Sequence, residues 1–209
     1  NEELVATLRA TTVNPRTRSL VETRTATNEL INRGADLLAS ASMGAADDDR
    51  ERRRQYGIWA VMQKSSMRTR TDSDIDLRAS NMAVGASRIF ARKSGELLFS
   101  PFVEYATGKY DSYMGDGTHG SGDLSYLGTG VLARMDRTNG AWMEAVLHGG
   151  STKANYRGQV YASRLTTYRY AAPYWAMQLG VGKTRPVGRA AQLDCYVRYF
   201  WSHTNGASA

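Results

Sequence analysis

The sequence has a single cysteine and no long apolar run. One cysteine among 209 residues allows no internal disulfide framework. No stretch approaches the roughly 20 uninterrupted apolar residues that a membrane-spanning helix requires. The chain starts with an acidic segment, Asn1 to Leu4, and no apolar segment follows it. We therefore expect either a cytoplasmic protein or a processed or excised piece of a longer one.

The overall composition excludes a disordered chain but does not separate a soluble protein from a membrane protein. Hydrophobic residues make up 42% of the chain, which is too many for intrinsic disorder. The mean hydropathy of -0.47 is typical of a soluble protein. Membrane barrels, however, alternate apolar and polar residues, so their average hydropathy is equally unremarkable.

The net charge of +7 raises the question of nucleic-acid binding. Basic residues are scattered along the chain, and the one dense charged run, residues 47–54, is half acidic. Its acidic half would repel phosphates. We interpret this run as a solvated connector and expect no nucleic-acid partner.

Motifs for catalysis and metal binding are missing as well. His119, His148 and His203 lie far apart in the sequence and have no partners at metal-ligand spacing. Residues 115–120 match the G-x-G-x-x-G pattern of dinucleotide sites, but no predicted helix begins after them. Cys195 falls on the apolar face of its predicted strand, which is unsuitable for a nucleophile. We predict no enzyme, no catalytic residue, no cofactor and no metal site.

Two carboxylates on predicted polar strand faces leave one alternative open. Glu104 and Glu144 could form an acid and base pair, or each could pair with a basic residue such as Arg134 or Arg198. We favour the ion pairs. His148 is expected to lie beside Glu144, four residues away on the same strand face.

Residues 14–42 show helical signals. Asn14 is a good N-cap, Pro15 occupies the favoured first position, and Leu30 and Leu37 recur one heptad apart. Polar residues surround this narrow apolar stripe, which is typical of a helix on a surface or in a water-filled cavity. Residues 43–55 are predicted to be the connector to the next region.

After Tyr56 the apolar period changes to two, which predicts strands. Most of them are about ten residues or longer, whereas strands of soluble domains average about five or six and a tilted membrane strand needs about nine to eleven. Their length therefore favours an outer-membrane barrel. The seven predicted strands are residues 58–67, 77–92, 95–105, 124–137, 141–152, 168–183 and 190–203.

The predicted connections alternate between long and short. Residues 92–95, 137–140 and 186–189 form tight turns, and Asn139-Gly140 predicts a type I′ hairpin. Longer polar, glycine-rich loops are predicted for residues 68–76, 106–123 and 151–167. In an up-and-down meander all long loops then share one end of the sheet, as in outer-membrane barrels.

The polar faces of the predicted strands combine charges with repeated glycines. A glycine inside a strand often marks the close approach of another segment, so we expect these faces to line a lumen that holds the polar helix. The predicted lumen-facing residues are Glu104, Gly128, Gly130, Arg134, Glu144, Gly180, Gly182, Asp194 and Arg198. Aromatic girdles are predicted from Tyr56, Trp59, Phe90, Phe99, Tyr105, Tyr168, Tyr170, Tyr174, Trp175, Tyr199 and Trp201.

Several strings of the sequence resemble one family when taken together and in order. They are Asn14-Pro15-Arg16-Thr17-Arg18-Ser19-Leu20, Asn32-Arg33-Gly34-Ala35-Asp36-Leu37, Phe102-Val103-Glu104-Tyr105, Tyr126-Leu127-Gly128-Thr129-Gly130 and Leu193-Asp194-Cys195-Tyr196-Val197-Arg198-Tyr199-Phe200-Trp201. Over nearly its whole length the chain resembles the β-barrel, or translocator, domain of autotransporters. The resemblance implies an all-β, antiparallel, up-and-down outer-membrane barrel of twelve strands with an N-terminal helix threaded through its lumen.

The resemblance also implies a domain organisation. Residues 1–55 would be linker and pore helix, and residues 56–209 the N-terminal part of the barrel, with roughly a third of the domain missing at the C-terminus. The pore-helix residues would include Asn14, Leu30, Asn32 and Asp36. Some members cleave their passenger with an asparagine on the helix. The paired-asparagine site of those members is not seen here, and Asn28 and Asn32 are the candidates that remain.

The implied function is to anchor in the outer membrane of a Gram-negative bacterium and to export an N-terminal passenger by type V secretion. The implied partners are outer-membrane lipid, the passenger and the outer-membrane assembly machinery. Two alternatives stay open: a soluble β-barrel that binds a small apolar ligand, and a surface adhesin that uses the long loops.

Overall fold

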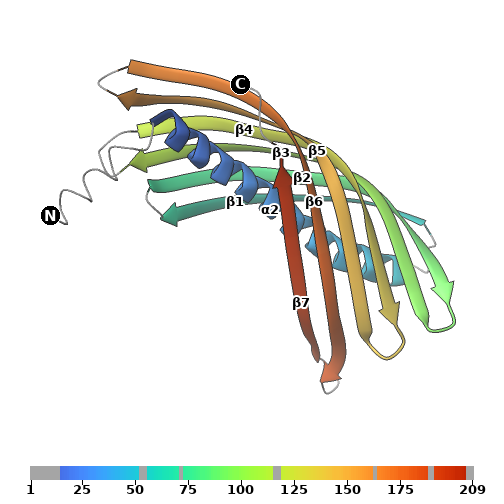
Figure 1. The fold of residues 1–209 in the computed structure, drawn as a ribbon. Helices are drawn as coiled ribbons and strands as arrows, with labels where there is room; N and C mark the ends of the chain where they lie inside the picture. Colours follow the sequence, from blue (N-terminus) through green and yellow to red (C-terminus); the bar gives the residue numbers. More distant parts are fainter. Residues whose placement is uncertain are drawn as a thin grey trace.

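The structure, a computed structural model, describes residues 15–51, 56–70, 73–114, 119–161, 164–187 and 191–205. One helix, α2 (Pro15–Glu51), lies against one side of a curved sheet (Figure 1). The sheet contains β1 (Tyr56–Arg70), β2 (Ser73–Arg92), β3 (Gly95–Met114), β4 (His119–Arg137), β5 (Ala141–Tyr161), β6 (Arg164–Val187) and β7 (Ala191–Thr204).

The strands follow one another in chain order, from β1 at one edge to β7 at the other, and every neighbouring pair is antiparallel. This is the up-and-down meander that the sequence predicts, with the predicted number of seven strands. No pairing among the described residues joins β1 to β7, so the sheet is a curled half-barrel with two edges. Because consecutive strands are linked by hairpins, alternate connections lie at opposite ends of the sheet.

The three predicted long loops are wrong, because the strands continue through most of them. β3 runs to Met114 and β4 begins at His119, whereas a loop over residues 106–123 was expected. Likewise β5 extends to Tyr161 and β1 to Arg70. In these segments every second side chain still faces inward, while most of the outward side chains are polar. The loss of outward apolar residues therefore marks the end of the apolar surface and not the end of the strand.

The hairpin between β4 and β5 differs from the predicted type I′ turn. The Gly140 amide donates to the Arg137 carbonyl over 3.0 Å, which makes Thr138 and Asn139 the central residues. Gly140 has a φ of 80°, so it occupies the left-handed position that follows the turn in a three-residue hairpin loop. The predicted turn at 186–189 falls partly on residues 188–190, outside the described residues.

Helix α2 is longer than predicted and ends at Glu51 rather than near residue 42. Within the segment expected to be a connector, Ala45, Ala46 and Arg50 favour a helix, and Asp47 and Arg50, three residues apart, can support one another on it. Asn14 lies outside the described residues. Among the described residues, no helix is long and apolar enough to cross a lipid bilayer.

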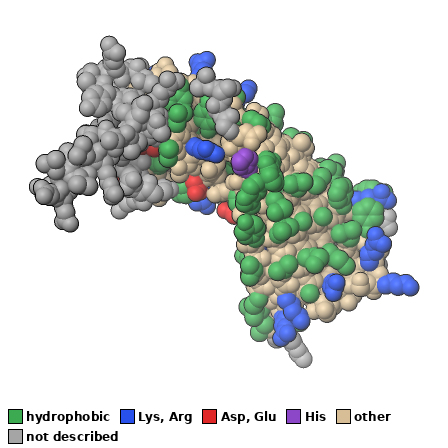
Figure 2. Space-filling model, viewed as in Figure 1, with side chains coloured by type: hydrophobic (Ala, Val, Ile, Leu, Met, Phe, Trp, Pro, Cys, Tyr) green, Lys and Arg blue, Asp and Glu red, His purple; other side chains and the backbone are tan. Residues whose placement is uncertain are grey.

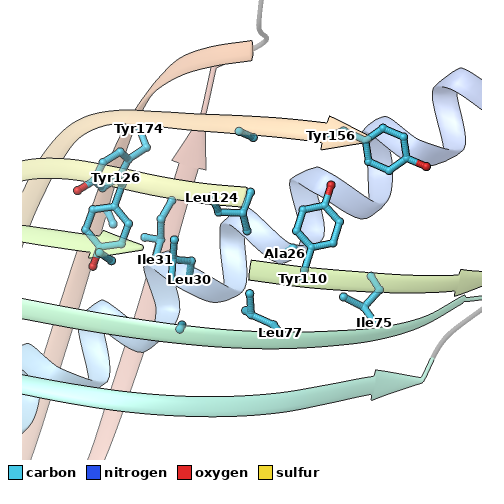
Figure 3. Packing of buried hydrophobic residues seen from close by; sticks show 14 residues of the cluster. Ala26, Leu30, Ile31, Ile75, Leu77, Tyr110, Leu124, Tyr126, Tyr156 and Tyr174 are labelled. Carbon is cyan, nitrogen blue, oxygen red and sulfur yellow. The ribbon is translucent and has the colours of Figure 1, made fainter. Parts of the chain in front are cut away.

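The interior between helix and sheet holds two apolar clusters. The larger one contains Ala26, Leu30 and Ile31 of α2, packed against Leu77, Tyr110 and other inward side chains of the sheet (Figure 3). The smaller one joins Leu38 to Phe102, Leu132 and Val146. Because Leu38 lies at a different level of the strands from Ala26, the helix runs along the strands and contacts most of them.

Candidate functional site

The outward face of the sheet carries an exposed band of large apolar side chains, which we call the apolar belt. Ile58 is 86% exposed, Val197 71% and Leu147 53%. On β3 the belt runs from Phe99 to Tyr105, about 20 Å along the strand. The belt consists of Tyr56, Ile58, Met62, Met82, Val84, Phe99, Val103, Tyr105, Leu127, Val131, Met143, Leu147, Trp175, Leu179, Val181, Val197 and Tyr199.

Polar residues predominate at both ends of the apolar belt, although Val187 and Leu193 at one end and Tyr113 at the other are also exposed. The turn end is the end with the β2–β3 and β4–β5 hairpins at residues 93–94 and 138–140. The other end, which we call the polar extension, comprises the strand segments 64–70, 73–80, 107–114, 119–125, 151–158 and 167–173. Figure 2 shows apolar side chains covering the lower part of the sheet, with Lys and Arg at its rim.

A buried carboxylate, Glu104, organises the middle of the inward face. Its Oε1 atom lies 2.6 Å from His148 Nδ1 and accepts a hydrogen bond of 2.6 Å from the Tyr174 hydroxyl. Tyr126 donates to Oε2 over 3.5 Å. Glu104, His148 and Tyr174 are all at most 3% exposed. His148 therefore lies beside Glu104 and not, as predicted, beside Glu144.

Glu144 organises a second network, nearer the turn end. Arg198 donates from Nε to Glu144 Oε1 over 2.7 Å, and Arg134 Nη1 lies 3.6 Å from Oε2. Gln178 donates to Oε1 over 3.2 Å. The sequence offered an acid and base pair of Glu104 with Glu144 or separate ion pairs, and for Glu144 the structure shows the ion pairs.

Two further carboxylates extend this second network. Arg134 also donates to Asp136 from Nε over 3.0 Å. Asp194 accepts hydrogen bonds of 3.0 Å from Trp142 Nε1 and Thr184 Oγ1. Buried charges that are paired and hydrogen-bonded in this way fix side-chain positions, whereas an unpaired one would cost several kcal/mol.

Tyrosines of the polar extension contact the N-terminal third of α2. The Thr23 hydroxyl lies 2.5 Å from the Tyr110 hydroxyl and 2.7 Å from that of Tyr168. Thr27 makes a similar contact of 2.9 Å with Tyr170. These contacts were not predicted from the sequence, although the tyrosines on the same strand face as the glycines were a signal for them.

The same end of the helix reaches β7. Arg24 donates from Nη2 to the Thr204 carbonyl over 3.2 Å, and Thr204 donates to Asn28 Oδ1 over 3.4 Å. Of the residues predicted for the pore helix, Leu30 is buried in the larger apolar cluster, Asn32 is half-buried and Asp36 is exposed.

The inward glycines make room for neighbouring side chains of the sheet rather than for the helix. A Cβ atom at Gly128 would meet the Tyr174 hydroxyl, and one at Gly130 would meet Phe102. At Gly180 and Gly182 it would meet Glu144 and Trp142. The predicted role of these glycines as space for the helix is therefore wrong. Side chains from adjacent strands bend over them.

One glycine of the helix does mark a close approach to the sheet. A Cβ atom at Gly34 would clash with the Tyr126 hydroxyl and would lie 3.6 Å from Glu104 Oε2. Gly34 therefore lets α2 approach the Glu104 network.

The predicted aromatic girdles are only partly right. Tyr56, Phe99 and Tyr105 lie in the apolar belt, and so do Trp175 and Tyr199. Other members of the predicted set turn inward because they occupy the opposite parity of their strands. Trp59 donates to Ser100, and Tyr168, Tyr170 and Tyr174 contact the helix or Glu104.

Comparisons with known proteins find similarity at the level of the fold. No protein-family model matches the chain, and no curated protein matches it. Among solved structures, the β domain of the Bordetella autotransporter BrkA matches 72% of this chain with a TM-score of 0.64 and 19% sequence identity. This chain has the autotransporter β-domain fold. It spans 59% of the length of the BrkA β domain.

The autotransporter fold agrees with the fold class expected from the sequence: antiparallel, up-and-down, and preceded by a helix on the inward side. In the part of the chain that the structure describes, no group of three or more His, Cys, Asp or Glu could hold a metal ion. The arrangement combines an interior, filled by the helix, of apolar clusters and buried charge networks with an apolar outward surface.

Proposed function

We propose that the chain is the translocator part of an autotransporter, which anchors in the outer membrane of a Gram-negative bacterium and exports a passenger that precedes it. The observation that carries this proposal is the reversed polarity of the sheet. Charged residues such as Glu104 and Glu144 are buried inward, while Ile58, Leu147 and Val197 are exposed outward. A bilayer is the solvent in which this arrangement is stable. The likeness to the BrkA β domain supports it.

The direction of α2 gives the proposed orientation. Thr23 contacts Tyr110 in the polar extension, Leu38 packs at the level of Phe102, and Tyr56 pairs with Arg88 near the turn end. The N-terminal end of α2 thus lies at the polar extension, so in this proposal that end faces the cell exterior and the turn end faces the periplasm. In this proposal residues 1–55 are linker and pore helix, residues 56–209 are barrel strands, and Glu104, Arg134, Glu144 and Arg198 face the lumen.

Spin-label accessibility tests the membrane placement. In the full chain with Cys195→Ala, a label at Leu147→Cys in the apolar belt is compared with one at Lys153→Cys in the polar extension. In lipid vesicles the first label should be relaxed mainly by oxygen and the second mainly by a water-soluble nickel chelate. Equal access of the chelate to both labels, with a chain that stays monodisperse without detergent, would favour the soluble alternative.

Surface display tests the export role. An epitope tag placed before Asn1 should become accessible to external protease in intact cells, and depletion of the outer-membrane assembly machinery should abolish this accessibility. If the tag stays protected from protease while the strands are in the outer membrane, the proposed anchoring role stands and the proposed export role is wrong. Retained display after shortening of the polar extension would argue against the adhesin alternative.

A further inference from the structure

The turn end of the sheet is basic on its outward face. Six exposed cationic side chains lie there, at the edge of the apolar belt or beyond it. Among the described outward-facing residues at this end there is no Asp or Glu, since Glu96, Asp136 and Asp194 occupy inward positions. The six, which we call the basic rim, are Arg88, Arg92, Lys93, Arg137, Lys183 and Arg185.

Strand register places three of these side chains in one row across the sheet. Arg92 pairs with Gly95, and Gly95 pairs with Arg137. Further along, Lys183 pairs with Ala141 at the start of β5. Since neighbouring strands lie about 4.8 Å apart, Arg92 and Arg137 are separated by roughly 10 Å, with only the hydrogen side chain of Gly95 between them. Such a row offers repeated positive charge at one height of the sheet.

Arg88 shows how the basic rim joins the apolar belt. Its guanidinium lies 4.9 Å from the centre of the Tyr56 ring and 4.7 Å from that of Phe90. Cation–π contacts of this kind hold the planar group against apolar surface while its N–H groups remain available to an anion. The charge therefore lies directly at the border between apolar and polar surface.

The polar extension at the opposite end differs in charge. Its outward face mixes signs: Arg68 donates to Asp76 over 2.6 Å, and Lys109 pairs across strands with Asp123. A charged border is thus present at both ends of the apolar belt, but only the basic rim has one sign.

We propose that the basic rim binds the phosphate groups of anionic phospholipids in the membrane leaflet that surrounds the turn end. This inference rests on the proposed membrane placement and adds a lipid class to it. Lys and Arg at a membrane surface attract anionic headgroups, and this attraction decays within a Debye length, so the rim must lie at headgroup height. Its position next to the apolar belt provides that height.

The same adjacency argues against nucleic acid as the partner. A duplex that contacted Arg88 and Arg92 would lie against exposed Tyr56 and Ile58, which offer no compensating charge. A lipid satisfies both surfaces, because its acyl chains cover the belt while its phosphate reaches the rim.

Electron spin resonance with labelled lipids tests the proposal on the full chain in dioleoylphosphatidylcholine vesicles. Lipid in contact with protein gives a motionally restricted signal, which is compared for spin-labelled phosphatidylglycerol and phosphatidylcholine. We expect phosphatidylglycerol to be preferred about threefold at low salt, and less at 0.5 M NaCl, as charge attraction requires.

Three variants distinguish an effect of the basic rim from an effect of the protein's total positive charge. The triple variant Arg92→Gln, Arg137→Gln, Lys183→Gln should lose the preference. A matched control in the polar extension, Lys109→Gln, Lys153→Gln, Arg169→Gln, should keep it. A charge-preserving variant, Arg92→Lys, Arg137→Lys, Lys183→Arg, should also keep it, which guards against a folding defect.

The possible failures are distinguishable. If neither lipid gives a restricted signal, the membrane placement itself is wrong. If both lipids are restricted equally, or if the polar-extension control loses the preference as fully as the rim variant, the membrane placement stands and the basic rim proposal is overturned. Rim-dependent binding of a DNA duplex, without any preference for phosphatidylglycerol, would also overturn it.

Discussion

The two faces of the sheet are built from the same seven strands and follow opposite rules. Inward, Glu104 and Glu144 are buried and surrounded by donors. Outward, Leu147 and its neighbours are large, apolar and exposed. In a soluble sheet the polar face would be the exposed one. Strand alternation therefore shows only that the two faces meet different environments. Which face suits lipid is indicated by exposure, because the exposed side chains are the apolar ones.

Among the variants that test this difference between the faces, removal of a central inward carboxylate should lower the free energy of unfolding most. Glu144→Ala leaves Arg198 and Arg134 without their shared acceptor, and loss of one partner from a buried charge network costs about 3–5 kcal/mol. We expect a corresponding fall in the free energy of unfolding, measured by tryptophan fluorescence during urea titration in lipid vesicles. Asp123→Ala, at an exposed carboxylate of the polar extension, serves as the control. An effect of Glu144→Ala no larger than the control would show that the network adds little stability.

A charge in the apolar belt tests the outward face. Leu147→Arg should destabilise the vesicle-inserted chain by about 2–4 kcal/mol, as for a basic residue near the bilayer midplane. Lys153→Glu, on the same strand face in the polar extension, should change stability by less than about 1 kcal/mol, because the proposed placement puts this position in water. Similar costs at both positions would contradict the proposed depth of the belt.

Filling the close approach between helix and sheet should have a smaller effect. Gly34→Ala gains helix propensity of about 0.5–1 kcal/mol but must displace the Tyr126 hydroxyl, and overpacking costs about 1–3 kcal/mol. We expect a net loss, seen as faster hydrogen exchange of the α2 amides. The double variant Gly34→Ala, Tyr126→Phe should recover much of the protection. If Tyr126→Phe does not restore the protection of the α2 amides, the Tyr126 hydroxyl is not the group that Gly34→Ala displaces.

Loss of one hydroxyl at the helix start should have the smallest effect. Tyr110→Phe removes one contact of Thr23, while the Tyr168 hydroxyl remains within 2.7 Å. A single neutral hydrogen bond contributes about 0.5–1.5 kcal/mol, so hydrogen exchange near Thr23 should rise only slightly. Thr23→Val removes both contacts and should raise it further. Equal effects of the two variants would mean that Tyr168 does not share the contact.

Alternation was enough to predict the strands but not their ends. The period of two identified all seven strands, because each side chain has to suit one of two environments. The predicted loop at 106–123 failed because Lys109, Asp111 and Asp123 were taken as loop residues, although Tyr110 and Gly122 keep the inward pattern between them. In the proposed placement, a strand that passes from lipid into water changes the polarity of its outward face only.

The partners of a buried carboxylate could be predicted only where few basic residues lay on the inward strand faces. Glu144 had basic residues on the inward faces of neighbouring strands, so its pairing with Arg134 and Arg198 followed from face assignment. Glu104 took His148 and Tyr174, which depend on strand register across β3 to β6, and register cannot be obtained from alternation. The contacts of Thr23 and Thr27 needed the position of the helix along the strands as well.

The length of the strands has a consequence for where an exported chain would be released. β5 and β6 contain 21 and 24 residues, and residues 151–161 of β5 continue about 35 Å along the strand beyond the apolar belt. In the proposed orientation these strand segments extend beyond the lipid headgroups. An exported chain would then leave these strands roughly 35 Å beyond the apolar belt, away from lipid that could trap its exposed apolar segments.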